Sequence, residues 1–131
     1  MSRKTIPKKT RLLIWEKYNR HCAYCGCGLE YKDMQVDHLE SVWKYEFNKL
    51  HHCSVPEEQL NSIENYMPSC RACNFYKGAW DLEKFRDNLS TMLYRNLAKN
   101  FNYKLLKKYG LIEEHIHEVK FYFEKIESEE V

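Results

Sequence analysis

The chain has 131 residues, a net charge of +2, and a composition that is 44% hydrophobic and 31% charged. This length suits one domain better than two, and the composition is that of a globular protein, with no Pro-rich, Gly-rich or repetitive tract to mark a flexible linker. No apolar run approaches the roughly 18 residues that a membrane span requires, and the N-terminus is polar from the start. We therefore expect a single domain over residues 1–131, no membrane association and a cytoplasmic location.

Charge is unevenly distributed along the chain. Residues 1–20 contain seven Lys and Arg residues against Glu16 alone, whereas residues 111–131 contain seven glutamates against two lysines. A basic N-terminal segment can follow the phosphates of a nucleic acid. A solvated helix face explains the same residues equally well.

The first half of the chain predicts a helix followed by a short β-structure. Apolar residues recur at helical spacing between Thr10 and Arg20. From Gly26 to Ser41 the glycines and the nearly alternating apolar residues predict a hairpin with Asp37 and His38 at its end. Residues 42–64 predict a long excursion from this core.

The second half predicts helices. A short helix over Arg71 to Lys77 should end at Gly78, where a left-handed conformation costs little. Asp81 is a plausible N-cap for a second helix, and a last helix is expected after Gly110. Each of these two predicted helices has a stripe of apolar residues along one face. Such a stripe usually packs in a core and less often forms a dimer interface. The two stripes are Leu82, Phe85, Leu89, Met92 or Leu93, and Leu97, followed by Ile112, Ile116, Val119, Phe123 and Ile126.

Two Cys-x-x-Cys pairs, Cys22 with Cys25 and Cys70 with Cys73, predict a structural zinc site. Zn²⁺ accepts four thiolates in tetrahedral geometry, and a reducing cytosol favours metal ligation over disulfides. Free buried cysteines or a redox pair are the alternatives. Binding worth on the order of 10 kcal/mol would be part of the folding free energy of so small a domain.

Two further cysteines, Cys27 and Cys53, remain outside these pairs. The string His51, His52 and Cys53 offers ligands for a second soft metal ion. A loop with adventitious metal affinity is the simpler interpretation.

Between and after the cysteine pairs lie the strings VDH at 36–38 and NYMPSCRACNFYKG at 65–78, and HCAYCG at 21–26 precedes them. In this order the chain resembles the HNH endonucleases of the zinc-stabilised ββα-metal, or His-Me finger, type. The final motif residue is Asn74 where histidine is common, which resembles the H-N-N variant. The resemblance covers about residues 11–86, and residues 87–131 carry no family signature.

This resemblance implies an α+β fold, in which a small ββα-metal nuclease core is clamped by the four-cysteine zinc site. An N-terminal helix and a C-terminal helical extension, about residues 87–131, would flank the core. The resemblance also implies that Asn65 orders the loop and holds the His38 ring. Short length fits a bacterial or phage setting by analogy.

The residues themselves fit phosphodiester hydrolysis. His38 is the candidate general base, since its usual pKa leaves much of it neutral at pH 7. Asp37 and Asn74 supply the hard oxygen ligands that Mg²⁺ prefers, and Mn²⁺ is an alternative. Lys77 shares a helical face with Asn74 and can grip a substrate phosphate, although a solvated lysine fits the pattern nearly as well.

The sequence thus predicts a metal-dependent endonuclease acting on DNA. A zinc-ribbon-like module that binds nucleic acid without cleaving it is the alternative. In a third hypothesis, the acidic C-terminal helix docks on a larger phage packaging or restriction complex, and a homodimer is an alternative assembly. Fold resemblance alone does not choose among these roles.

Overall fold

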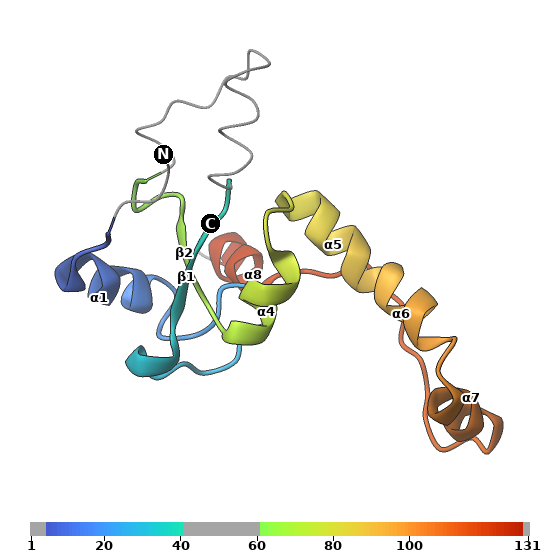
Figure 1. Ribbon diagram of the computed structural model, residues 1–131. Coiled ribbons are helices and arrows are strands. Elements are labelled where there is room, and N and C mark those ends of the chain that lie inside the picture. The colour runs from blue at the N-terminus through green and yellow to red at the C-terminus, as the bar shows by residue number, and fades with distance from the viewer. Residues whose placement is uncertain (1–4, 41–60, 130–131) are drawn as a thin grey trace, which may run out of the picture. The chain divides into compact units, whose positions relative to one another are not determined.

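The computed structural model describes residues 5–40 and 61–129, which form two compact units (Figure 1). The first unit contains the described residues up to Leu82 together with the segment that begins at Phe121, and the second contains Glu83–Lys120. Helices and a small sheet together confirm the α+β class. A division into two units does not by itself separate two domains, so the expected single domain stays a prediction.

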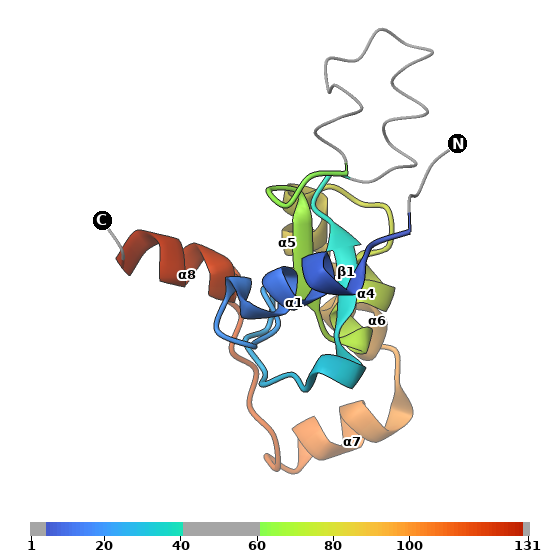
Figure 2. The same cartoon turned by 90° about the vertical axis from the view of Figure 1, so that its left-hand side faces the viewer.

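The first unit is built around two antiparallel strands, β1 (Gln35–His38) and β2 (Tyr66–Ser69). Gln35 pairs with Ser69 at one end of the sheet and His38 with Tyr66 at the other. Helix α4 (Arg71–Lys77) follows β2 directly. Figures 1 and 2 show α1 (Lys8–Lys17) and α4 on opposite sides of the sheet.

The predicted hairpin over Gly26 to Ser41 is wrong, because β1 pairs with β2, which begins at Tyr66. Most of the excursion predicted over residues 42–64 lies outside the described residues. The residues before β1 form an isolated bridge between His21 and Gly28 and a 3-10 turn, η1 (Tyr31–Asp33). Alternation of apolar residues identifies a strand but not its partner. The prediction that Asp37 and His38 end the strand is confirmed.

Helix α1 packs by a buried apolar residue, Ile14, against Met34 and Tyr66. Two of its basic side chains bind backbone carbonyls. Lys17 Nζ donates to the carbonyl oxygens of Ile63 at 2.8 Å and Tyr66 at 2.9 Å. Arg11 donates to the Met34 carbonyl at 3.1 Å. The Lys17 contacts hold the start of β2 and the Arg11 contact holds the residue before β1, so part of the basic N-terminal charge has a structural role.

The last predicted helix is displaced towards the C-terminus. Residues 111–121 are not helical, and α8 spans Tyr122–Glu129. Its first two backbone N–H groups, of Tyr122 and Phe123, donate to the carbonyls of Tyr24 and Ala23 at 3.0 and 2.8 Å. Because the first N–H groups of a helix have no partner within it, these bonds favour a start at Tyr122 over one at Ile112.

The second unit consists of helical segments. Helix α5 (Leu82–Ser90) begins at the boundary between the units, and α6 (Met92–Leu97) and α7 (Phe101–Lys108) follow. The expected helix after Asp81 is therefore interrupted at Thr91. Helix α7 was not predicted, although the Asn100 side chain caps it by accepting from the Tyr103 N–H at 3.0 Å.

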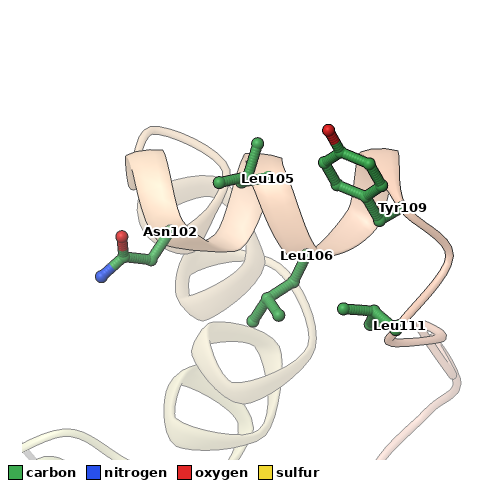
Figure 3. A pocket seen from close by; sticks show the side chains of 5 residues that line it. All are labelled: Asn102, Leu105, Leu106, Tyr109 and Leu111. Carbon is green, nitrogen blue, oxygen red and sulfur yellow. The ribbon is translucent and has the colours of Figure 1, made fainter.

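A pocket of about 300 Å³ lies beside α7 in the second unit (Figure 3). It is lined by Asn102, Leu105, Leu106, Tyr109 and Leu111. This lining is mainly apolar and holds no acid, imidazole or thiol, so the pocket itself offers no group for hydrolytic chemistry. No helix in the described part of the chain is long and apolar enough to cross a membrane.

Candidate metal sites and active site

The four predicted zinc ligands come together in the first unit. One sulfur atom from each of Cys22, Cys25, Cys70 and Cys73 lies within 4.8 Å of the others, and the Cys25 and Cys70 sulfurs are 3.9 Å apart. Ligands about 2.3 Å from a tetrahedral Zn²⁺ lie about 3.8 Å from one another. The spacing therefore suits zinc.

The protonation of these thiols also fits a cation. A hydrogen bond with Cys73 is the main cause that lowers the pKa of Cys22 to about 4, and the same bond raises the pKa of Cys73. Burial chiefly raises the pKa of Cys25. A thiolate at Cys22 thus raises the pKa of the neighbouring Cys25 and Cys73, and a divalent cation bound to such sulfurs would favour their thiolate forms.

Each cysteine pair is presented by a different local structure. Cys22 and Cys25 lie in a tight turn, closed by the Gly26 N–H donating to the Cys22 carbonyl at 3.0 Å. Cys70 is the N-cap of α4, and its sulfur accepts from the Cys73 N–H at 3.4 Å. We call residues 22–26 the knuckle. Outside the cluster, Cys27 is exposed, and the predicted second ligand group His51, His52 and Cys53 lies outside the described residues.

Gly26→Ala should destabilise the knuckle. Gly26 has φ +82°, and a Cβ atom there would lie 2.9 Å from Cδ1 of Tyr122 on α8. Left-handed backbone alone costs an L-residue about 1–2 kcal/mol, and the Tyr122 ring must also move. We expect the free energy of unfolding to fall by at least that amount in urea titrations.

Gly28→Ala is the matched control, because no atom lies within 4 Å of its added Cβ and its φ is not left-handed. It should unfold like the unmodified protein. Equal destabilisation by the two substitutions would contradict this description of the knuckle.

The two predicted ligands of the catalytic metal lie where β1 faces α4. Asp37 belongs to β1 and Asn74 to α4. Side chains alternate along a strand, so Gln35 and Asp37 share this face. Asn74 of α4 donates from Nδ2 to Gln35 Oε1 at 2.6 Å. Asp37 Oδ2 accepts from the Tyr24 hydroxyl at 2.5 Å and pairs with Lys77 Nζ at 3.1 Å. The two predicted ligands thus extend from adjacent elements on one side of the sheet.

Each of these two side chains has one oxygen that could accept a cation. Among the residues that the structure describes, no donor contacts Asp37 Oδ1 or the side-chain oxygen of Asn74. A carboxylate and an amide oxygen are hard ligands suited to Mg²⁺ or Mn²⁺. The donor set therefore fits the predicted cation.

His38 lies at the end of β1, on the opposite face from Asp37. Its Nε2 lies 3.3 Å from the side-chain oxygen of Asn61, and its ring packs edge-on against Tyr66, with centroids 5.3 Å apart. The ring is buried, with 7% of its surface exposed. These contacts fix the orientation of the ring at the end of the strand.

Asn65 organises the chain that follows His38. Its side-chain oxygen accepts from the Glu40 N–H at 2.7 Å, its Nδ2 donates to the Glu40 carbonyl at 3.0 Å, and its own carbonyl accepts from the Leu39 N–H. These bonds are those of a residue that orders this loop. The His38 ring itself has the Asn61 side chain as a partner.

Asn65→Ala should therefore loosen the loop. The substitution removes both hydrogen bonds between Asn65 and Glu40, and a hydrogen bond of this kind contributes about 0.5–1.5 kcal/mol. We expect a lower urea midpoint for the zinc-loaded variant. Asn61→Ala removes a contact with His38 but none with Glu40, so it should change the midpoint less; the reverse order would contradict these roles.

Lys77 is placed differently from a substrate-binding lysine. Its side chain has no exposed surface, and Nζ donates to the His38 carbonyl at 3.1 Å as well as pairing with Asp37. A phosphate cannot reach an ammonium group that is fully covered. We therefore do not assign Lys77 a substrate contact, and its bonds instead join α4 to the end of β1.

Sequence reasoning missed three contributors to this site: Tyr24, Gln35 and Asn61. Tyr24 is buried in the knuckle, and burial together with the Asp37 carboxylate raises its pKa well above the usual value, so it stays a donor. Its position between two of the clustered cysteines, Cys22 and Cys25, was the available signal. Gln35, two residues before Asp37, could have been placed on the same face. No sequence signal identified Asn61.

Two curated proteins are similar to this chain. The SPbeta prophage-derived protein YoqL of Bacillus subtilis strain 168, named as a candidate HNH endonuclease, is 29% identical over 98 residues, or 72% of this chain and 37% of that protein. The Septu protein PtuB of Bacillus thuringiensis is 30% identical over 105 residues, or 75% of this chain and 35% of that protein. The matches span little more than a third of each relative.

The name of the first relative supports the HNH endonuclease family for this chain. No family model matches the sequence. No solved structure matches it either.

Proposed function

We propose that the chain is a metal-dependent HNH endonuclease that hydrolyses phosphodiester bonds of DNA. The observation that carries this proposal is the joint placement of Asp37 and Asn74 on one face of the sheet, with His38 at the end of the same strand. The order β1, β2, α4, closed by the cysteine cluster, supports a ββα-metal core of the H-N-N type.

In this proposal His38 is the general base. The neutral ring takes the proton of the water that attacks the phosphorus atom, in line with the leaving 3′ oxygen. Its orientation depends on the contacts with Asn61 and Tyr66. The product ends are then a 5′-phosphate and a 3′-hydroxyl.

Asp37 and Asn74 would hold one Mg²⁺ or Mn²⁺ through the two oxygens that lack donors among the described residues. When bound, the cation supplies positive charge at the scissile phosphate and at the developing alkoxide. Asn65 keeps the residues after His38 in place through Glu40. The four cysteines would hold a structural Zn²⁺.

DNA is the proposed substrate because the name of the relative YoqL describes it as an HNH endonuclease. The test is a panel of end-labelled duplex DNA, single-stranded DNA and RNA with the zinc-loaded protein and Mg²⁺ or Mn²⁺. We expect cleaved DNA whose nicks DNA ligase reseals directly, since it requires 5′-phosphate and 3′-hydroxyl ends. Gel-shift binding without cleavage of any nucleic acid would favour the non-catalytic binding module instead.

Assembly stays a prediction. The C-terminal helix α8 is engaged within the first unit, where the Tyr18 hydroxyl donates to Glu127 Oε2 at 2.8 Å and the Tyr18 and Phe123 rings are in contact. Measurement of the mass in solution tests the homodimer. Docking on a phage or restriction complex would have to use the surface of α8 that does not contact the rest of the first unit.

A further inference from the structure

One side chain connects the zinc knuckle to the candidate active site. Tyr24 lies between Cys22 and Cys25 in the sequence, and its ring is 2% exposed. Its hydroxyl reaches Asp37 Oδ2 at 2.5 Å, across 13 residues of chain. The residue that a Cys-x-x-Cys turn places between its ligands thus contacts the carboxylate proposed to bind the catalytic cation.

The same carboxylate oxygen is held from a second direction. Lys77 Nζ lies 3.1 Å from Asp37 Oδ2 and donates to the His38 carbonyl at 3.1 Å. Both donors are nearly or fully buried, as is Asp37 itself at 6% exposure. Two donors from two elements, the knuckle and α4, therefore converge on Oδ2 and leave Oδ1 without a donor among the described residues.

Burying the charged groups of Asp37 and Lys77 costs free energy of desolvation, which suggests that the pair has a functional role. A buried ion pair rarely stabilises a fold more than apolar residues of the same size would. A fixed carboxylate, however, is what a metal site needs, because partners that orient a ligand commonly change metal affinity or activity 10- to 100-fold. The ring of Tyr24 packs edge-on against Phe121, with centroids 5.5 Å apart. This packing restricts the ring and therefore the position of its hydroxyl.

We propose that Tyr24 is a positioning residue that fixes the Asp37 carboxylate so that Oδ1 is the oxygen presented to the catalytic cation. The inference rests on the proposed function, since it requires Asp37 to be a metal ligand. It adds a role for the knuckle beyond holding zinc: the structural metal site sets the geometry of the catalytic one. Lys77 assists by holding the same Oδ2.

The test is a titration of the zinc-loaded protein with Mn²⁺ in the absence of DNA. Electron paramagnetic resonance measures the free Mn²⁺ at each step. Tyr24→Phe removes only the hydroxyl and should raise the apparent Kd by about 10-fold or more, with zinc content unchanged. Tyr18→Phe is the matched control: it also removes a tyrosine hydroxyl from a carboxylate, that of Glu127, and should bind Mn²⁺ normally. An unchanged Kd for Tyr24→Phe would overturn the inference.

Asp37→Asn separates this inference from the proposed function. If Asp37→Asn leaves Mn²⁺ binding unchanged, the proposed cation site itself fails. If Asp37→Asn weakens binding and Tyr24→Phe does not, only the positioning role fails. In the Asp37→Asn background, adding Tyr24→Phe should have no further effect, because Tyr24 acts through the Asp37 carboxylate; a full additional loss would contradict that route.

Discussion

Cys70→Ser should cost the protein its zinc and its cooperative fold. The Cys70 sulfur is one of four within 4.8 Å of one another, and the two cysteine pairs close the chain around β1 and β2. Structural zinc binding is worth on the order of 10 kcal/mol, comparable to the whole stability of a typical domain, about 5–15 kcal/mol. Thermal unfolding by circular dichroism, together with bound zinc per chain, measures the loss.

The substitution separates the effect of losing the metal from the effect of losing the N-cap of α4. Cys70 is the N-cap of α4 and its sulfur accepts from the Cys73 N–H, a bond that a serine hydroxyl also makes. Cys27→Ser is the control, because Cys27 lies outside the four-sulfur cluster and is exposed. A Cys70→Ser protein that keeps one zinc and melts normally would refute the clamp, as would loss of zinc from Cys27→Ser.

His38→Ala should lower the rate of DNA cleavage by about 10²- to 10⁴-fold, the usual contribution of a general base. The ring also packs on Tyr66, and a close aromatic pair contributes about 0.5–1.5 kcal/mol, so a modest loss of stability is expected. Single-turnover rates on supercoiled plasmid, at temperatures where zinc content and circular dichroism match those of the unmodified protein, isolate the catalytic effect.

Two controls sharpen this prediction. His115→Ala removes a histidine that is 77% exposed in the second unit and should leave the rate unchanged. Added imidazole should restore part of the activity of His38→Ala, because the substitution opens space where the ring lay and the missing function is proton transfer. A His38→Ala protein that cleaves at the normal rate would remove His38 from the role of base.

Local signals in the sequence predicted local structure well. The paired cysteines converge, α4 spans Arg71–Lys77 as expected, and Gly78 ends it with φ +51°. Each of these features depends on residues close in sequence or on a cysteine spacing that is typical of zinc sites. Asp37 and His38 likewise end a strand, because a short run of alternating residues suffices to define one.

Features that depend on distant partners were not predicted. The partner of β1 is β2, which begins at Tyr66, so the residues just before β1 do not form the predicted hairpin. The start of α8 depends on carbonyls of the knuckle about 100 residues earlier, which no periodicity near Ile112 reveals. Lys77 illustrates the same limit: its helical position was right, but its burial against Asp37 follows from the packing of α4 on β1.

The most direct measurement is conversion of supercoiled plasmid to nicked or linear DNA by the zinc-loaded protein, with and without added Mg²⁺. If Asp37, His38 and Asn74 form a nuclease site, cleavage should appear with Mg²⁺ or Mn²⁺, be absent without added metal, and vanish in Asp37→Asn. Cleavage that ignores both the metal and Asp37, or intact plasmid with folded, zinc-loaded protein under all of these conditions, would contradict the account.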